Sequence, residues 1–271
     1  MPPISLVVSD VDGTLLTKDK ILTGAADAAV RRLHGVGIGF TIVSSRPTIG
    51  MRFLVEPLGI TLPVGAFNGS SIVDPKTMQA IEQHLIPQAA AERAVQLLRK
   101  AGVGIWVFTN EEWLIDNPDG EYVAHEQRTI HSAPTIVDDF APYLSRACKI
   151  VGASSDAPLL ERCETEMQKA LGSQAMAVRS QTYYLDVTPP GHDKGTFVTA
   201  MAERLGIATD AVATIGDMQN DLPMFGRSGF SVAMGNATDE VKKHASRVTS
   251  SNEEEGFAGA IDQILKANEA R

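Results

Sequence analysis

Two aspartates follow a short apolar run near the start of the chain, and they constrain the fold more than any other feature. The run over residues 4–8 predicts a buried strand, and Asp10 and Asp12 come just after it. Because side chains two residues apart on an extended chain point the same way, both carboxylates are expected at the carboxyl end of this strand. Two like charges there are costly unless a cation or a shared proton compensates them. The sequence therefore predicts a charged site at this strand end, from which Gly13 lets the backbone turn sharply away.

The segments after this strand have the alternation of a parallel α/β sheet. A helix is predicted over residues 23–34, a second buried strand over residues 38–43, and another helix over residues 49–58. Strand and helix in alternation indicate a parallel sheet with right-handed crossovers, whose ligands bind beyond the carboxyl ends of the strands. Ser44, which follows the second strand, is therefore expected beside the two aspartates.

The middle of the chain follows a different pattern. A hairpin within residues 72–82, strand pairs within residues 103–115 and 176–187, a strand over residues 149–153 and helices over residues 87–100 and 158–171 are typical of antiparallel α+β structure. A Thr-Pro-Pro-Gly linker at residues 188–191 ends this region, and α/β alternation then resumes. We therefore predict an α/β fold in which a parallel-sheet core, residues 1–82 and 190–271, is interrupted by an inserted domain, residues 83–189.

A second pair of acids follows a later strand. The apolar run over residues 212–215 leads through Gly216 to Asp217, and Asp221 lies one helical turn further on. Four carboxylates at neighbouring strand ends would repel one another in a partly dry cleft. A hard divalent cation removes this repulsion, and Mg²⁺ suits a site that keeps several waters for a substrate phosphate.

The set of motifs and their order resemble the haloacid dehalogenase superfamily of aspartate-nucleophile phosphatases. The motifs are Asp10-Val11-Asp12-Gly13-Thr14-Leu15, Ser44 after a strand, Lys194 within residues 191–195, and Gly216-Asp217 with Asn220-Asp221. Asn68-Gly69 and the run over residues 233–237 also resemble family signatures. The long gap between Ser44 and Lys194 resembles the Cof-type branch, whose large α/β cap is inserted there. The resemblance implies a Rossmann-like core with an inserted α+β cap.

The resemblance gives the acidic residues and the lysine their expected roles. Asp10 would attack phosphorus and form an aspartyl-phosphate, and Asp12 would donate a proton to the leaving alkoxide and later accept one from water. Lys194 would neutralise charge developing between Asp10 and the phosphoryl group. The resemblance implies Mg²⁺ as the cofactor, held by Asp10, by the backbone carbonyl of Asp12 and by Asp217. Asp221 either binds the metal through water or orients a neighbour.

Substrate contacts are expected from a second group of residues. Ser44 would hydrogen-bond a phosphoryl oxygen, and Ser45 stands where this branch commonly has glycine. Arg46 either contacts substrate or braces the loop that faces the cap, and Asn68 either reaches the substrate or only forms a turn. Asn220 could hold Lys194 or the loop. The predicted phosphate- and substrate-binding set is Ser44, Ser45, Arg46, Asn68, Lys194 and Asn220.

Composition and charge narrow the range of partners. A net charge of −9 argues against a nucleic-acid or anionic-membrane binder. No apolar run of transmembrane length and no signal peptide is visible, and the two cysteines have no metal-site spacing. We therefore expect a cytoplasmic protein whose partner is a small-molecule phosphate ester. Its oligomeric state is left open.

These features favour a Mg²⁺-dependent phosphomonoester hydrolase. Its expected substrates are small phosphorylated metabolites, and the resemblance points to sugar phosphates most often. Two alternatives stay open at this point. A phosphotransferase or mutase would use the same aspartyl-phosphate with another acceptor, and a non-catalytic sensor of phosphometabolites would use the same scaffold. The sequence lacks the glycine-rich motifs of nucleotide-binding loops, which disfavours those folds.

Overall fold

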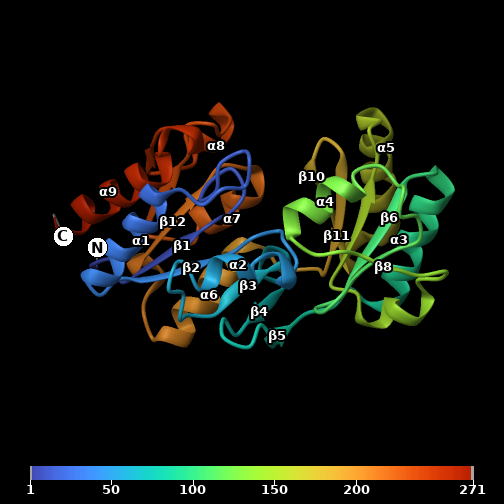
Figure 1. The fold of residues 1–271 in the computed structure, drawn as a ribbon, viewed down its shortest axis with the longest axis horizontal. Coiled ribbons are helices and arrows are strands. Elements are labelled where there is room, and N and C mark those ends of the chain that lie inside the picture. The colour runs from blue at the N-terminus through green and yellow to red at the C-terminus, as the bar shows by residue number, and fades with distance from the viewer. Residues whose placement is uncertain (1, 270–271) are drawn as a thin grey trace.

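The computed structural model describes residues 2–269, which form two lobes (Figure 1). The first, which we call the core lobe, is built on a five-stranded sheet in which every neighbouring pair is parallel. The predicted α/β class with a parallel-sheet core is confirmed. The strands, in spatial order, are β14 (Arg247–Val248), β13 (Phe230–Ala233), β12 (Val212–Gly216), β1 (Leu6–Ser9) and β2 (Gly39–Ile42).

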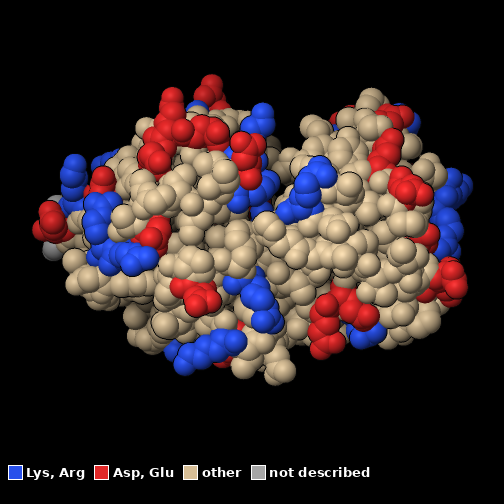
Figure 2. Space-filling view, viewed as in Figure 1, with Lys and Arg blue, Asp and Glu red and all other residues tan. Residues whose placement is uncertain are grey.

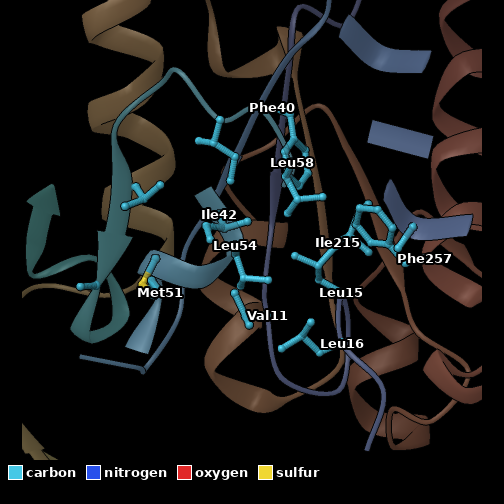
Figure 3. Close-up of a cluster of buried hydrophobic side chains, with 14 of the residues drawn as sticks. Val11, Leu15, Leu16, Phe40, Ile42, Met51, Leu54, Leu58, Ile215 and Phe257 are labelled. Carbon is cyan, nitrogen blue, oxygen red and sulfur yellow. The ribbon is translucent and has the colours of Figure 1, made fainter. Parts of the chain in front are cut away.

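Helices cover both faces of this sheet. On one face, α1 (Gly24–Gly35) packs against α9 (Gly256–Glu269), and their apolar side chains join those shown in Figure 3. On the other face lie α6 (Lys194–Leu205), α7 (Leu222–Phe225) and α8 (Asp239–Lys243). Burial on both faces explains why β1 and β12 are almost wholly apolar.

A small antiparallel sheet extends the core lobe. It consists of β3 (Val64–Ala66), β4 (Ser71–Val73) and β5 (Ala80–Gln83), and a parallel bridge from Val43 to Gly65 joins it to the end of β2. The single helix predicted over residues 49–58 is wrong. A 3₁₀ turn at Thr48–Gly50 and a short helix α2 (Arg52–Val55) stand there instead. Gly50 and Pro57 explain the interruption, because glycine weakens a helix and proline has no N–H with which to continue one. Glu56, the residue before Pro57, still has helical angles.

The second lobe, which we call the cap, carries a six-stranded sheet. Two helices, α3 (Gln88–Ala101) and α5 (Ala157–Leu171), pack on one face, and the short α4 (Val123–Ile130) lies on the side of the core lobe (Figure 1). All six strands come from residues 104–188, within the predicted insertion. In spatial order they are β10 (Met176–Gln181), β11 (Tyr184–Thr188), β9 (Lys149–Ala153), β6 (Gly104–Phe108), β7 (Trp113–Ile115) and β8 (Thr135–Ile136).

The two lobes share one apolar cluster. Phe67 of the core lobe lies 6.5 Å from Phe108 of β6 between ring centroids, and both side chains are fully buried. The cap face opposite to α3 and α5 therefore packs toward the core lobe, with β10, β11 and α4 nearest to it (Figure 1). None of the helices formed by residues 2–269 has the length and apolar character needed to cross a lipid bilayer.

Candidate active site

The carboxyl ends of two adjacent strands bring three carboxylates together. Strands β1 and β12 are parallel neighbours, and the backbone N–H of Asp10 donates to the carbonyl of Ile215 at 2.9 Å. Asp10 and Asp217 therefore leave the sheet side by side. Each of Asp10, Asp217 and Asp221 offers a carboxylate oxygen, and these oxygens lie within 4.8 Å of one another. The structure thus brings together three of the four predicted acids.

A buried lysine sits between two of these acids. Lys194 opens α6 and is 1% exposed. Its Nζ lies 2.5 Å from Asp10 Oδ1 and 2.6 Å from Asp221 Oδ1. Burial alone would lower the pKa of Lys194, but the two carboxylates outweigh it and raise that pKa above its usual range. Lys194 is therefore a fixed positive charge beside Asp10.

Asp221 has a positioning role in this arrangement. While its Oδ1 accepts from Lys194, its Oδ2 accepts from the backbone N–H groups of Asp217 and Met218, each at 2.8 Å. Both of its oxygens are thus engaged by the protein. Asp221 orients Lys194 and the turn that carries Asp217.

Asp217 is held by groups to which the sequence analysis gave no role. Thr14 Oγ1 donates to Asp217 Oδ1 at 2.9 Å, and Asn236 Nδ2 donates to Asp217 Oδ2 at 3.1 Å. Gly13 has a φ of +82°, and a Cβ there would lie 2.4 Å from Asp217 Oδ2, so no larger residue fits. Thr14 lies in the first motif, and Asn236 lies in the run over residues 233–237. Membership of these motifs is the sequence feature that could have pointed to both residues.

The electrostatics of this cluster fit a divalent cation. Burial raises the pKa of Asp10, and the charge of Asp221 adds to this while Lys194 opposes it. Burial also raises the pKa of Asp217, with further contributions from Asp10 and Asp221. One lysine leaves three buried carboxylates with excess negative charge, which a hard cation with oxygen ligands removes. Asp10 and Asp217 are the side chains that fit a Mg²⁺ site.

Asp12 belongs to a different charge cluster. Arg46 donates to both of its oxygens, from Nε at 2.6 Å and from Nη2 at 2.8 Å, and Lys20 Nζ lies 2.7 Å from Oδ1. Burial would raise the pKa of Asp12, but the hydrogen bonds and charge of Arg46, with those of Lys20, hold it well below its usual range. In this arrangement Asp12 is ionised, and both of its oxygens are engaged by basic side chains.

The loop after β2 connects the site to the cap. Arg46 is 3% exposed, and its Nη1 donates to the carbonyl of Thr129 in α4 at 2.6 Å. Lys149 of β9 donates from Nζ to the carbonyl of Ser45 at 3.1 Å. Ser44 is buried, and its Oγ accepts the backbone N–H of Arg46 at 3.2 Å. Through these contacts Arg46 braces the loop that faces the cap, which is one of the two roles expected for it from the sequence.

The two predicted asparagines contact each other. Asn220 Nδ2 donates to Asn68 Oδ1 at 3.1 Å, and the backbone N–H of Asn68 donates to the carbonyl of Ser44 at 2.8 Å. Asn68 has a φ of +58° next to Gly69, which fits a turn. This pair therefore joins the Ser44 loop to the turn after β12.

The cleft between the lobes contains two cavities. The larger has a volume of about 310 Å³ and lies between strands β10–β11 and core-lobe residues that include Asn68, Met218 and Asn220. The smaller, about 80 Å³, is bordered by Asp12 and Arg46 together with cap residues. Figure 2 shows a notch between the lobes on one face, with basic side chains on both sides of it. The three clustered carboxylates line neither cavity, but residues close to them in the sequence do: Asp12 borders the smaller cavity, and Met218 and Asn220 border the larger.

Comparison with known proteins places this chain in one family. A model of the haloacid dehalogenase-like hydrolases matches residues 7–261, and the chain belongs to this family. The 5-amino-6-(5-phospho-D-ribitylamino)uracil phosphatase of Bacillus subtilis is 29% identical over 289 residues, which cover 97% of this chain and 99% of the relative. The HMP-PP phosphatase of Cronobacter sakazakii is 29% identical over 234 residues, or 86% of this chain and 84% of that protein.

A solved structure agrees with these relatives. The crystal structure of a haloacid dehalogenase-like hydrolase from Bacteroides thetaiotaomicron aligns with a TM-score of 0.88 and 29% identity, covering 96% of this chain and 99% of that one. The resemblance drawn from the motifs is therefore confirmed. The protein is a phosphatase of the haloacid dehalogenase type.

Proposed function

We propose that the protein is a Mg²⁺-dependent phosphomonoester hydrolase that acts on small phosphorylated metabolites through an aspartyl-phosphate on Asp10. The observation that carries this proposal is the contact between Asp10 and the buried Lys194, next to Asp217. A nucleophilic carboxylate needs a fixed cation beside it to accept a dianionic phosphate. The names of the two relatives above describe phosphatases of a ribitylaminouracil phosphate and of HMP-PP. These names support a small-molecule phosphate ester as the substrate of this protein.

The residues divide the reaction between them. Asp10 attacks phosphorus, so that a bond from its carboxylate oxygen forms while the bond to the leaving alkoxide breaks. Lys194 balances the charge that gathers on the phosphoryl oxygens, and Ser44 would donate a hydrogen bond to one of them. Mg²⁺ bound at Asp10 and Asp217 would neutralise further phosphate charge. The ion pairs of Asp12 with Arg46 and Lys20 must open before Asp12 can carry a proton to the leaving group or take one from water.

The lobes have separate tasks in this proposal. Residues 1–82 and 190–271 form the catalytic core, and residues 83–189 form a cap that covers the cleft and contacts the organic part of the substrate. All strands of the six-stranded sheet lie within residues 83–189. Arg46 and Lys149 join the core and the cap through their hydrogen bonds to backbone carbonyls of the other lobe. A closed cap keeps bulk water from the reacting groups and strengthens the charge interactions there.

Hydrolysis in labelled water tests the proposal. The protein with Mg²⁺ should release phosphate from p-nitrophenyl phosphate and from a panel of metabolite monoesters, and removal of Mg²⁺ with EDTA should stop the reaction. Asp10→Asn should lower kcat by about a thousandfold or more, because the nucleophile is lost. In H₂¹⁸O the released phosphate should carry the label. Unlabelled product would instead indicate transfer to another acceptor, and full activity of Asp10→Asn would exclude the covalent route.

A further inference from the structure

The smaller cavity in the cleft lies beside the residue proposed to act on the leaving group. Asp12 lines this cavity of about 80 Å³, and so does Ser45, the neighbour of Ser44. From the cap, His125 and Tyr183 border it. A space of this size holds a group of only a few heavy atoms, since a single water needs about 10–15 Å³ of it. The cavity therefore has the position and the size for a small leaving alcohol.

Basic side chains surround Asp12 at this cavity. Lys20 and Arg46 both line it, and each forms an ion pair with the carboxylate of Asp12. Lys149 lines it as well, but its Nζ is already engaged by the carbonyl of Ser45 at 3.1 Å. Two cations at the cavity thus share one carboxylate.

A tight turn presents Lys20 to the cavity. The backbone N–H of Lys20 donates to the carbonyl of Thr17 at 2.9 Å, and that of Ile21 donates to Thr17 Oγ1 at 3.1 Å. Lys20 has a φ of +64°, a left-handed angle that lysine rarely adopts. Its side chain is 30% exposed, against 3% for Arg46. Lys20 is therefore the cation that an incoming ligand can reach first.

Opening of these ion pairs leaves positive charge at the cavity. Asp12 must leave Lys20 and Arg46 before it acts on the leaving group, and Arg46 is then a buried cation without its partner. Breaking a buried ion pair in this way is strongly unfavourable. Glu126 also lines the cavity, but burial raises its pKa and so favours its uncharged form. An anionic group of the substrate can take the place of Asp12.

We propose that the substrate is the phosphate ester of a small hydroxy acid, and that its carboxylate binds Lys20 in place of Asp12. The inference rests on the proposed function and makes the substrate class narrower. A carboxylate in the cavity pairs with Lys20 and compensates the charge of Arg46, so Asp12 is released toward the leaving oxygen. A hydroxyl of a neutral sugar can accept a hydrogen bond from Lys20, but it brings no charge. Lys20 is therefore a specificity-determining residue.

Matched pairs of phosphate esters test this specificity. Phosphoglycolate and 3-phosphooxypropanoate have one and two methylene groups between the ester oxygen and the carboxylate, and their primary amides have nearly the same shape without the charge. We expect kcat/KM at neutral pH to be higher for the acid than for its amide by about tenfold or more in at least one pair, because pairing between charged groups is the stronger interaction. Glycerol 3-phosphate, whose leaving group offers only hydroxyls, should resemble the amides.

Variants of two lysines in the same loop locate the preference. The readout is the ratio of kcat/KM for an acid to that for its amide, because effects shared by both substrates cancel in this ratio. Lys20→Gln should bring the ratio close to one, whereas Lys20→Arg, which keeps the positive charge, should retain most of the preference. Lys18→Gln is the matched control, since Lys18 is exposed, lies outside the residues lining this cavity and changes the net charge equally. Thermal melts of each variant check that the fold is intact.

The results separate this inference from the proposed function. If none of the esters and no p-nitrophenyl phosphate is hydrolysed with Mg²⁺, the proposed function itself fails and the inference falls with it. If phosphate esters are hydrolysed but neither acid is preferred to its amide, only the inference about the carboxylate is overturned. A preference that persists in Lys20→Gln, or that Lys18→Gln lowers equally, would overturn the assignment of Lys20.

Discussion

At the scale of single residues, the proposed Mg²⁺ site requires glycine at position 13, because a Cβ there would lie 2.4 Å from Asp217 Oδ2. We expect Gly13→Ala to raise the Mg²⁺ concentration needed for half-maximal activity by about tenfold or more, since the new methyl group displaces a carboxylate that the cation needs. Left-handed backbone strain would add about 1 kcal/mol of lost stability. The measurement is activity against Mg²⁺ concentration.

Gly37→Ala supplies the control for this prediction. Gly37 also has a positive φ, +76°, but an added Cβ there meets no atom within 4 Å. It should lose similar stability and keep its Mg²⁺ dependence. Equal Mg²⁺ dependence of the two variants would mean that strain, and not the clash with Asp217, controls the site.

Glu126 of α4 should make stability depend on pH. Burial raises its pKa, with the nearby Lys149 opposing and Asp186 adding to the shift, followed by smaller effects of Arg46 and Asp12. The folded state therefore keeps a proton that the unfolded state releases from about the ordinary glutamate pKa of 4.5 upward. The contribution of Glu126 to the free energy of unfolding is therefore fully present below pH 4.5, and it is lost as the pH rises through the raised pKa of the folded state.

We expect Glu126→Gln to remove this loss. Relative to wild type, the variant should become progressively more stable in melting experiments as pH increases from 5 to 8. The exposed Glu203, changed to Gln, should follow the wild-type profile. Parallel profiles for wild type and Glu126→Gln would show that Glu126 ionises normally despite its burial.

At the scale of elements, the first turn of α6 places Lys194. The side chain of Asp193 caps this helix by accepting the backbone N–H of Thr196 at 2.8 Å. Asp193→Ala should cost about 1 kcal/mol of stability, as losing such a cap usually does. It should also lower kcat by about tenfold or more, because small displacements of a catalytic group are costly.

A second capped helix provides the comparison. Asp156 caps α5 in the cap lobe by accepting the backbone N–H of Leu159 at 2.9 Å. Asp156→Ala should lose similar stability, measured by urea unfolding, without a change in kcat. If Asp193→Ala also kept its kcat, the position of Lys194 would depend on its ion pairs alone.

The elements differ in how far their sequence predicted them. β1 and β12 were evident because strands buried on both faces are uninterrupted apolar runs, and the acids of the site come directly after them. The helix α4 was not predicted, since it starts after Tyr122 at a φ of +64° without a capping side chain. The contact of Arg46 with Thr129 joins residues 83 positions apart, and no local pattern reports such a pairing.

At the scale of the whole molecule, the closed cleft depends on an apolar contact between the lobes. Ile130 at the end of α4 is buried against Gly50, where an added Cβ would lie 3.1 Å from the Ile130 Cβ. Near it, the lobes are also joined by the hydrogen bond from Thr48 Oγ1 to Asn110 Oδ1, 2.8 Å long. When the lobes separate, the polar groups of such a link can pair with water instead, whereas apolar side chains gain nothing from water, so we expect the apolar contact to contribute most to closure.

We therefore expect Ile130→Ala to shift the protein toward an open form. Apparent substrate affinity falls with the fraction of molecules that are closed, so KM should rise about two- to tenfold for substrates that contact the cap. The radius of gyration from small-angle X-ray scattering should increase. Leu160→Ala, on the opposite face of the cap sheet, should lose about 2–5 kcal/mol of stability with KM unchanged. If both variants raised KM equally, general loosening of the cap would explain the effect, and closure through Ile130 would be disproved.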